Sequence, residues 1–312
     1  MPRSRFLFGH LTYYAVLIVS GMILAMILAS REEKRLHLPK DTVLDLCLFL
    51  LPLSILGARL YYVIFSWEQY RTDPLEIFAV WEGGLAIYGG IIAGFLTVII
   101  FSKWRHLSPA LLLDVIIPGV PLAQAMGRWG NYFNMEAYGA AVSDPRFQFF
   151  PFAVQIADGG QTTWHLATFF YESVWDLLVF LLLYFLLRKR KKHHGDLFLW
   201  YLCLYATGRM LIEELRTDSL FSLQGTFRVS QLLSMVICLC VSFIMLLKTN
   251  QRRLLSYILF AIQCILLIWM ISGRARLRAP LLAVDALWGI GTFAVLYLLR
   301  NRTSCAEKPA RR

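Results

Sequence analysis

A series of long apolar runs, joined by short polar connections, limits what this chain can fold into. Each run approaches the roughly 20 residues that a helix needs to cross a bilayer. The runs fall near residues 6–29, 43–65, 83–101, 111–126, 165–187, 197–212, 229–247, 254–272 and 280–299. In hydrocarbon, each backbone N–H and C=O needs a partner within the protein, which only helices and closed barrels provide. The runs therefore predict an all-α polytopic membrane protein, with a seven-helix transmembrane core and two further C-terminal transmembrane helices.

The balance of residue types supports a membrane protein. Hydrophobic residues make up 58% of the chain and charged residues 16%, whereas about a quarter of a soluble domain is charged. The net charge of +11 comes from basic residues between the apolar runs, where they set topology and meet anionic headgroups. We therefore expect membrane lipid, and no nucleic acid, as a partner. No cysteine cluster has metal-site spacing, so we expect no metal and no cofactor.

The polar connections suggest how the chain is divided. Residues 1–247 would form the membrane core, and within it residues 131–164 are the one extended polar insertion. We expect this insertion to form a small extracytoplasmic head, with short strands around residues 147–156. Residues 31–35 read as a charged loop, 248–300 as a C-terminal transmembrane extension, and 301–312 as a basic tail.

Basic residues alternate between the two sides of the predicted bundle. The loops after the first, third, fifth and seventh runs are the basic ones, with Lys34, Arg35, Lys103, Arg105, residues 188–192, Lys248, Arg252 and Arg253. Because positive loops stay in the cytoplasm, we expect an extracytoplasmic N-terminus and a cytoplasmic C-terminus. The basic residues at 274, 276 and 278 go against this pattern.

Polar residues crowd residues 127–139, where the fourth run ends. Arg128, Asn131, Asn134 and Glu136 lie close together in an otherwise apolar chain. An ionisable residue at membrane depth is costly, and it therefore indicates a functional site. The alternative is an interfacial arginine–glutamate pair that closes a helix and reaches the headgroups.

A second polar set lies in the sixth run. Tyr205, Arg209 and Glu213 are spaced i, i+4 and i+8, so they share one helix face. If the helices form one bundle, Arg59, Arg128, Arg209 and Arg216 could line a shared cavity, with Asn131, Glu136 and Glu213 nearby. Arginine can hold a phosphate through two parallel hydrogen bonds, which lysine cannot. The alternative is a simple ion pair between Arg209 and Glu213 within the helix.

Paired glycines flank Tyr88, at 83–84 and at 89–90. Small residues in membrane helices mark close helix packing more often than ligand contact, so the residues themselves favour packing here. No GxSxG, HExxH or phosphate-loop motif occurs, so hydrolase, metalloprotease and nucleotide-driven functions have no support.

Residues 128–139, with the pattern RxGNxxNxExxG, closely resemble the signature of bacterial prolipoprotein diacylglyceryl transferases. Further matches to this family follow in order, at residues 12–14 (TYY), 57–62 (GARLYY), 81–90 (WEGGLAIYGG), Asp114, 168–172 (TFFYE), 205–216 (YxxGRxxxExxR) and 230–234 (SQxxS). The resemblance covers about residues 11–247. It implies an enzyme of the bacterial cell membrane that transfers diacylglycerol from phosphatidylglycerol to the lipobox cysteine of a prolipoprotein, as the first step of lipoprotein maturation.

The resemblance also implies roles for individual residues. A thiol attacks a glycerol carbon and glycerol phosphate leaves, so fixed cations at the leaving phosphate would be the most useful catalyst. We expect Arg128 and Arg209 to fill that role, with Glu213 holding Arg209. Asn131, Glu136 and Tyr14 would orient the headgroup and substrate. The expected substrate-binding residues are Tyr14, Arg59, Gly89, Asn131, Asn134, Tyr205, Glu213 and Arg216.

Two features depart from the family pattern. Many members have a histidine with an assigned catalytic part where this chain has Tyr88, and a tyrosine with a pKa of about 10 is a poor base at neutral pH. The base could be Glu136, Tyr88 or the field of the arginines themselves, and the sequence does not choose among them. The last two apolar runs have no counterpart in the usual seven-helix member.

Two other functions compete with the transferase. A lipid or anion transporter would also use intramembrane arginines, but it predicts internal symmetry, which the sequence lacks. The second is a relative that has lost catalysis and only binds prolipoprotein or lipid. Tyr88 is the best argument for this function. The intact set of Arg128, Asn131, Glu136 and Arg209 weighs against it.

Overall fold

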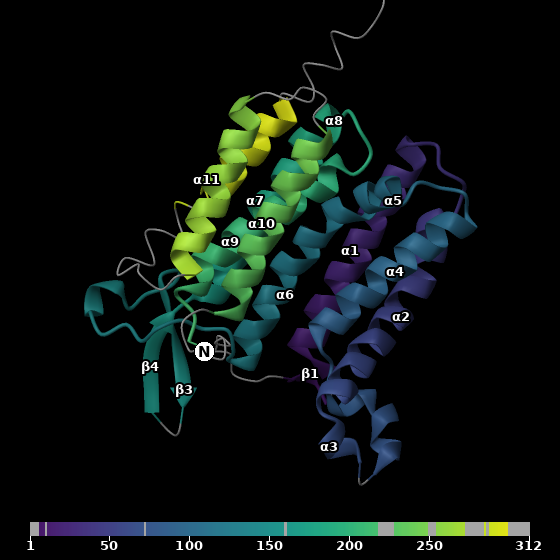
Figure 1. The fold of residues 1–312 in the computed structure, drawn as a ribbon. Coiled ribbons are helices and arrows are strands. Elements are labelled where there is room, and N and C mark those ends of the chain that lie inside the picture. Colours follow the sequence, from purple (N-terminus) through teal and green to yellow (C-terminus); the bar gives the residue numbers. More distant parts are fainter. Residues whose placement is uncertain are drawn as a thin grey trace, which may run out of the picture. The chain divides into compact units, whose positions relative to one another are not determined.

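A computed structural model of the chain describes residues 6–9, 11–71, 73–158, 161–217, 228–248, 254–271, 284 and 287–298. The chain divides into two compact units (Figure 1). The first unit holds Met1–Met22, Val120–Lys192 and Asp196–Arg312, and the second holds Ile23–Gly119 and His193–Gly195. Helix α1, Tyr13–Arg35, contributes its first part to the first unit and the rest to the second.

Helices dominate the described residues, as the apolar runs predict. By length and composition, six of these helices can cross a membrane, namely Tyr13–Arg35, Thr42–Phe65, Ile87–Trp104, Pro109–Asn134, Thr168–Arg190 and Val229–Lys248. The strands of the described residues form two short hairpins. The expected all-α polytopic membrane fold is therefore confirmed.

The second unit is built around two long helices, α2 (Thr42–Phe65) and α4 (Ile87–Trp104), which lie side by side (Figure 1). Short helices complete it, namely α3 (Trp67–Tyr70), η1 (Pro74–Phe78), η2 (Val80–Glu82), α5 (Pro109–Ile116) and η3 (Ile117–Gly119). A Cβ on Gly57 would lie 2.8 Å from the carbonyl oxygen of Gly89, and a Cβ on Gly89 would lie 2.3 Å from that of Gly57. The expectation that the glycines near Tyr88 serve helix packing is thus confirmed for Gly89.

The first unit holds the other helices. A small hairpin, β1 (Phe6–Phe8) and β2 (Leu11–Thr12), precedes α1. The remaining elements are α6 (Val120–Asn134), η4 (Pro145–Phe147), β3 (Ala153–Asp158), β4 (Gln161–Leu166), α7 (Thr168–Leu181), a π-helical stretch (η5, Leu182–Leu187), α8 (Arg188–Arg190), α9 (Asp196–Glu213), α10 (Val229–Lys248), α11 (Leu254–Ile271) and a helix over Leu287–Leu298. Neighbouring pairs are α6 with α7, α7 with α9, α9 with α10, and α10 with α11.

The largest apolar core of the first unit lies between α9, α10 and the helix Leu287–Leu298. Cys203 and Met210 of α9 are buried there against Met235 of α10, while Phe293 and Leu296 of the last helix are fully buried. The ring of Trp200 meets that of Phe293 edge-on, with centroids 4.5 Å apart. This C-terminal helix therefore supports α9 and α10 by filling the space beside them. The expected second C-terminal run lies partly outside the described residues.

The start and end of the first predicted span were wrong. The chain forms the β1–β2 hairpin over residues 6–12, so α1 begins at Tyr13. The helix then continues through residues 31–35, which we expected to be a loop. These charged residues remain helical because their side chains form contacts at the end of α1 and at the start of α2. Glu32 pairs with Arg35, and the Glu33 carboxylate accepts the backbone N–H of Asp41 (3.2 Å) and of Val43 (2.6 Å) at the start of α2.

The start of the predicted head also differs. Residues 131–134, which we assigned to the head, are the last residues of α6. Their polar side chains suggested a loop, but tertiary packing can keep residues of low helix propensity within a helix. One strand, β3, overlaps the expected range, although it begins at Ala153 and not near residue 147, and its partner β4 lies beyond that range.

Candidate functional site

Three arginines of the first unit converge on a single carboxylate, that of Glu172 in α7. Arg128 of α6 places Nη1 3.1 Å from Glu172 Oε2, and Arg216, just after α9, places Nη1 3.0 Å from Oε1. Arg209 of α9 pairs with the same Oε1. The Glu172 side chain is 5% exposed, so it is nearly out of reach of water. Glu172 therefore fixes the mutual positions of cations that come from three different parts of the chain.

Two further carboxylates complete this cluster. Asp176 lies one turn after Glu172 in α7, and its Oδ2 is 3.7 Å from Arg128 Nε. Glu213 of α9 places Oε2 2.7 Å from Arg209 Nη2, which confirms the expected pair. We call these six side chains the arginine cluster: Arg128, Arg209, Arg216, Glu172, Asp176 and Glu213. Three guanidinium groups face three carboxylates, so their formal charges balance and each buried charge has a partner, as burial requires.

The exposure of the arginine cluster is uneven. The side chains of Arg128 and Arg209 are each 20% exposed, whereas those of Glu172, Asp176 and Glu213 are 2 to 5% exposed. The space between α6, α7 and α9, bordered by Tyr205, holds only about 10 Å³, roughly the room for one water. A phosphate would therefore meet the outer edges of the two guanidinium groups. The carboxylates behind them would keep those edges in place.

These contacts change the alternative interpretation of the signature. An interfacial pair between Arg128 and Glu136 is wrong, because Arg128 pairs with Glu172 and Asp176. Glu136 is exposed and accepts a hydrogen bond from Asn134 Nδ2, at 2.8 Å. The Glu136 carboxylate is thus held apart from the three carboxylates of the arginine cluster.

The backbone around Glu136 adopts an uncommon conformation. Met135 and Ala137 have φ values of 55° and 57°, in the left-handed region that non-glycine residues seldom enter. The Glu136 N–H donates to the carbonyl oxygen of Asn131 at 3.0 Å, and the hydroxyl of Thr168 donates to that of Ala137 at 2.7 Å. Contacts on both sides therefore fix the direction of Glu136. Strained backbone of this kind is common at functional sites.

Glycines of the signature permit close contacts. A Cβ on Gly130 would lie 2.6 Å from Cδ2 of Tyr14, so glycine allows the Tyr14 ring to rest on α6. A Cβ on Gly139 would lie 2.5 Å from the carbonyl oxygen of Leu215, where residues 139 and 216 form a β-bridge. The segment after α6 is thus attached to the segment after α9. Tyr14, Gly130 and Gly139 all lie in the first unit.

Aromatic and amide side chains support the α9 face. The Tyr205 ring stacks on Tyr201 with centroids 5.7 Å apart, and the Tyr201 hydroxyl donates to Gln124 Oε1 at 3.0 Å. Tyr205 and Arg209 border the same small space, as their spacing predicts. Gly208 leaves room for Trp175, whose indole N–H donates to the carbonyl oxygen of Leu204 at 3.0 Å.

The remaining predicted residues, Arg59, Tyr88 and Gly89, belong to the second unit. Arg59 is 6% exposed and donates to backbone carbonyl oxygens, from Nε to Ile77 at 2.9 Å and from Nη1 to Gly83 at 2.8 Å. Further donation goes to the carbonyls of residues 76 and 84. Arg59 therefore holds the connection between α3 and α4 together. Tyr88 is 38% exposed at the start of α4.

Sequence reasoning missed the centre of the arginine cluster. Glu172 was noted as part of a family element, but neither it nor Asp176 was proposed as a site residue. A signal was present, since two acids spaced i, i+4 in an apolar run share one helix face and need cationic partners. Arg209 in α9 and Arg216 just after it were available as such partners.

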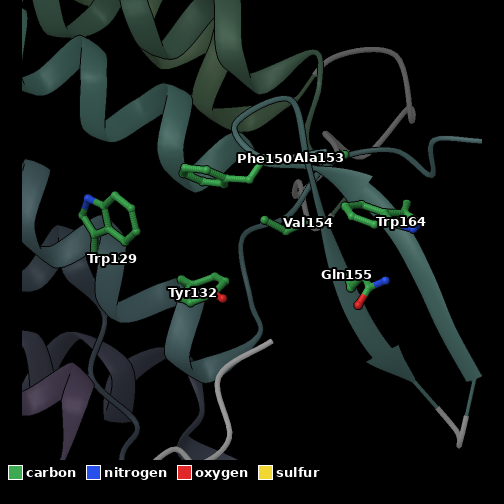
Figure 2. Close-up of a pocket in the computed structure, with 7 residues that line it drawn as sticks. All are labelled: Trp129, Tyr132, Phe150, Ala153, Val154, Gln155 and Trp164. Atoms are coloured by element: carbon green, nitrogen blue, oxygen red, sulfur yellow. The ribbon is translucent and has the colours of Figure 1, made fainter. Parts of the chain in front are cut away.

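A separate hollow lies in the first unit, between α6 and the β3–β4 hairpin (Figure 2). Its volume is about 270 Å³, and its lining is mostly aromatic or apolar, with Trp129, Tyr132, Phe150, Ala153, Val154, Gln155 and Trp164. We call it the aromatic pocket. In Figure 2, Trp129, Tyr132 and Phe150 face the hairpin across the hollow. No ionisable acid or base of the described residues lines it apart from the Tyr132 phenol.

Known proteins share this sequence over most of its length. A family model described as prolipoprotein diacylglyceryl transferase matches residues 5–248. The phosphatidylglycerol–prolipoprotein diacylglyceryl transferase of Limosilactobacillus reuteri (strain DSM 20016) is 44% identical over 246 residues, 77% of this chain and 88% of that protein. The enzyme of that name from Enterococcus faecalis (strain V583) is 45% identical over 258 residues, 80% of this chain and 91% of that protein. A Streptococcus agalactiae serotype Ia relative is 44% identical over 246 residues, 78% of this chain and 94% of its own length.

Proposed function

This chain belongs to the prolipoprotein diacylglyceryl transferase family, and we infer that it is the enzyme that lipidates prolipoproteins. It transfers the diacylglyceryl group from phosphatidylglycerol to a prolipoprotein, in the first step of bacterial lipoprotein maturation. Its apolar helices make it a multi-pass protein of the bacterial membrane. The acceptor in our proposal is the thiol of the lipobox cysteine, which explains why the enzyme needs no nucleophile of its own.

The reaction exchanges one bond for another. The acceptor sulfur forms a bond to the glycerol carbon that carries the phosphate ester, and the bond from that carbon to the ester oxygen breaks. Glycerol phosphate leaves with the electron pair, and the thiol proton passes to a base or to solvent. Negative charge grows on the leaving phosphate, so cations placed there in advance would lower the barrier.

The arginine cluster supports a role at the leaving phosphate. Arg128 and Arg209 are held by Glu172 from behind while part of each guanidinium stays exposed. Preorganised donors of this kind need not reorganise as charge develops. In the proposal, Arg128 and Arg209 bind the phosphate, and Arg216 and Glu213 keep the arrangement in place. This convergence on Glu172 is the observation that carries the assignment.

The signature segment would handle the rest of the headgroup and the acceptor. Asn131, Asn134 and Tyr14 would orient the substrates, with Tyr205 beside the arginines. Glu136 is the base candidate of the first unit, since it is exposed and its direction is fixed. Roles for Arg59, Tyr88 and Gly89 toward substrate remain predictions of the family resemblance.

The test uses Arg128→Ala and Arg209→Ala in membranes supplied with phosphatidylglycerol and a lipobox peptide. Mass spectrometry of the peptide measures the diacylglyceryl thioether. We expect each variant to lose about a hundredfold or more in rate, the range seen when one charge-stabilising donor is removed. Arg→Lys at either position should also be impaired, because lysine cannot bind a phosphate through a planar pair of N–H groups.

The matched control is Arg146→Ala. Arg146 is an exposed arginine that pairs with Asp144 alone among the described residues, so its loss should leave the rate unchanged. Gel filtration and tryptophan fluorescence check that each variant keeps its fold. Near-normal transfer by both folded alanine variants would refute the phosphate-binding assignment, while leaving the transferase activity itself in place.

We also propose that the N-terminus is extracytoplasmic and the C-terminus cytoplasmic, on the distribution of basic loops. Reporter fusions at the two ends test this topology. An active cytoplasmic reporter at the N-terminus would contradict it.

A further inference from the structure

We propose that the aromatic pocket and the free edge of β3 form the docking site for the acceptor peptide, which would add to the hairpin as an extended strand. The inference rests on the proposed function, since the acceptor is the prolipoprotein. It goes beyond that function because it names where, and in what conformation, the acceptor binds.

The hairpin has one occupied and one open edge. On the far side of β4, Val142 N–H donates to Trp164 O at 2.7 Å and Leu166 N–H donates to Ala140 O at 3.0 Å. Residues 140–142 therefore pair with β4 opposite β3. Strand β3, in contrast, pairs with no strand other than β4 among the described residues. The N–H of its first residue, Ala153, donates to Phe149 O at 2.7 Å, so the open part of the edge lies at the exposed residues Gln155 and Ala157. An edge of this kind presents a row of backbone donors and acceptors that another chain can join.

The aromatic pocket lies beside this open edge. Gln155 and Trp164 are directly opposite each other in the hairpin, so their side chains share one face, and both line the hollow together with Ala153 and Val154. The hollow therefore borders the face that carries Gln155, and successive side chains of a strand alternate between the two faces. A peptide paired with β3 would therefore place side chains in the pocket at every second position.

The size and lining of the pocket fit an apolar peptide side chain. Its volume of about 270 Å³ is slightly below the roughly 300–1,000 Å³ of pockets that enclose drug-sized ligands, so two long acyl chains would not fit. No arginine, lysine or histidine lines it, so it offers no cation to a phosphate. The Trp129 and Tyr132 rings instead offer apolar surface.

Helix α6 connects this pocket to the arginine cluster. Arg128 pairs with Glu172, while its neighbour Trp129 lines the pocket, with Tyr132 one turn further along. A peptide held along β3 would thus be bound by the same helix that carries the proposed phosphate ligand. One short rigid element would set the distance between the acceptor thiol and the donor lipid.

The test compares two tryptophan substitutions on one exposed face of the hairpin. Gln155→Trp places bulk in the pocket, whereas Thr162→Trp adds the same bulk at an exposed residue of β4 that does not line it. With a lipobox peptide and phosphatidylglycerol in nanodiscs, we expect Gln155→Trp to raise KM for the peptide about tenfold or more, as loss of an apolar pocket contact does. KM for the lipid and kcat should stay unchanged, and Thr162→Trp should behave as wild type.

A chemical probe tests strand pairing without changing the protein. Lipobox peptides methylated at single backbone nitrogens lose one donor each. Pairing with β3 predicts that the rise in KM alternates along the peptide with a period of two, because every second N–H faces the partner strand. A photoreactive phenylalanine in the peptide should crosslink to residues 153–155, and this measurement stands even where a variant fails to fold.

The outcomes separate the proposal from the function. An unchanged peptide KM in Gln155→Trp, or methylation effects without alternation, would overturn strand docking while transfer continues. A rise in KM for the lipid alone would assign the pocket to an acyl chain and would also overturn it. Absence of the thioether product with wild-type protein would instead refute the proposed function.

Discussion

Buried arginines are held in two different ways in this protein. In the first unit, Arg128, Arg209 and Arg216 share the carboxylate of Glu172. In the second unit, Arg59 donates to backbone carbonyl oxygens within residues 76–84. Both solutions satisfy the donors of a buried guanidinium, but one uses side chains and charge, and the other uses main chain and no charge.

The difference indicates different functions. A carboxylate and a phosphate each offer two anionic oxygens to a guanidinium, so an arginine can bind one while keeping contact with the other. Arg59 cannot leave its carbonyl partners without leaving buried acceptors unpaired. We therefore interpret the arginine cluster as the part suited to binding a charged substrate and Arg59 as a fixed structural contact. Four changes to the chain, beginning with the strongest, test this contrast.

Removal of the shared carboxylate should have the largest effect. Glu172→Ala leaves three partly buried cations with fewer partners, and breaking a fully buried ion pair costs about 3–5 kcal/mol, which is an upper bound here. Glu172→Gln keeps the shape and should retain more stability, yet lower kcat more than it raises KM, because the arginines lose their fixed spacing. Thermal unfolding in detergent and thioether kinetics measure the two effects. Glu68→Gln, at an 85% exposed side chain, is the control, and equal behaviour of both glutamines would contradict the prediction.

Loss of Arg59 should destabilise the connection between α3 and α4. Arg59→Met removes the donors of several carbonyl groups, at about 1–3 kcal/mol for each buried acceptor left unpaired. We expect faster proteolysis within residues 73–84 and a lower unfolding temperature. Arg59→Lys should recover little of this, because one ammonium cannot reach all the carbonyls. A protease-resistant loop combined with a raised KM for phosphatidylglycerol would instead place Arg59 in contact with substrate.

The packing of α2 on α4 should respond to a single methyl group. Gly57→Ala or Gly89→Ala puts a Cβ within 2.8 Å or less of the facing backbone, and overpacking of this kind costs about 1–3 kcal/mol. The unfolding temperature of each variant measures this. Gly291→Ala, at a helical glycine with nothing within 4 Å, is the control and should be neutral or slightly stabilising. Equal stability of Gly89→Ala and the control would show that the helices can separate freely.

Relief of the strained backbone should give the smallest effect. Ala137 has a φ of 57°, and Ala137→Gly should stabilise the fold by about 0.5–1 kcal/mol. Ala141→Gly is the control. Ala141 has no positive φ, so this variant should lose stability. If the Ala137→Gly variant gains stability but transfers more slowly, the strained conformation contributes to the direction of Glu136.

The order of the membrane helices could be predicted from the sequence, because apolar length determines them locally. The expected spans at residues 43–65 and 229–247 agree with α2 and α10 to within a residue or so. The predicted helix boundaries were wrong where polar side chains hydrogen-bond to the end of a helix. Glu33 extends α1 because it receives backbone N–H groups from the start of α2, a contact that depends on tertiary structure and leaves no periodic trace in the sequence.

The candidate site could be predicted only in part, because some of its contacts are local in sequence and others are not. The spacing of Arg209 and Glu213 within one helix predicts their contact, which the structure confirms. The partners of Arg128 lie 44 and 48 positions further along the chain, in α7, and no local pattern selects one acid over another at such a separation. The acceptors of Arg59 are carbonyl groups, which every residue has, so they leave no trace in the sequence, and the role of Arg59 toward substrate stays a prediction.

The π-helical stretch at Leu182–Leu187 gives α7 one residue more than a regular helix of that length holds. It lies after Glu172 and Asp176, so deletion of one residue within it would convert it to ordinary α-helix and turn only the basic end at Arg188–Arg190. The same deletion between Thr168 and Asp176 would rotate the carboxylates away from their arginines by about 100°, since one residue is 1/3.6 of a turn. Insertions and deletions should therefore be tolerated after Leu182, whereas before Leu182 they should abolish activity. A scan of single-residue deletions along α7 would reveal this asymmetry directly.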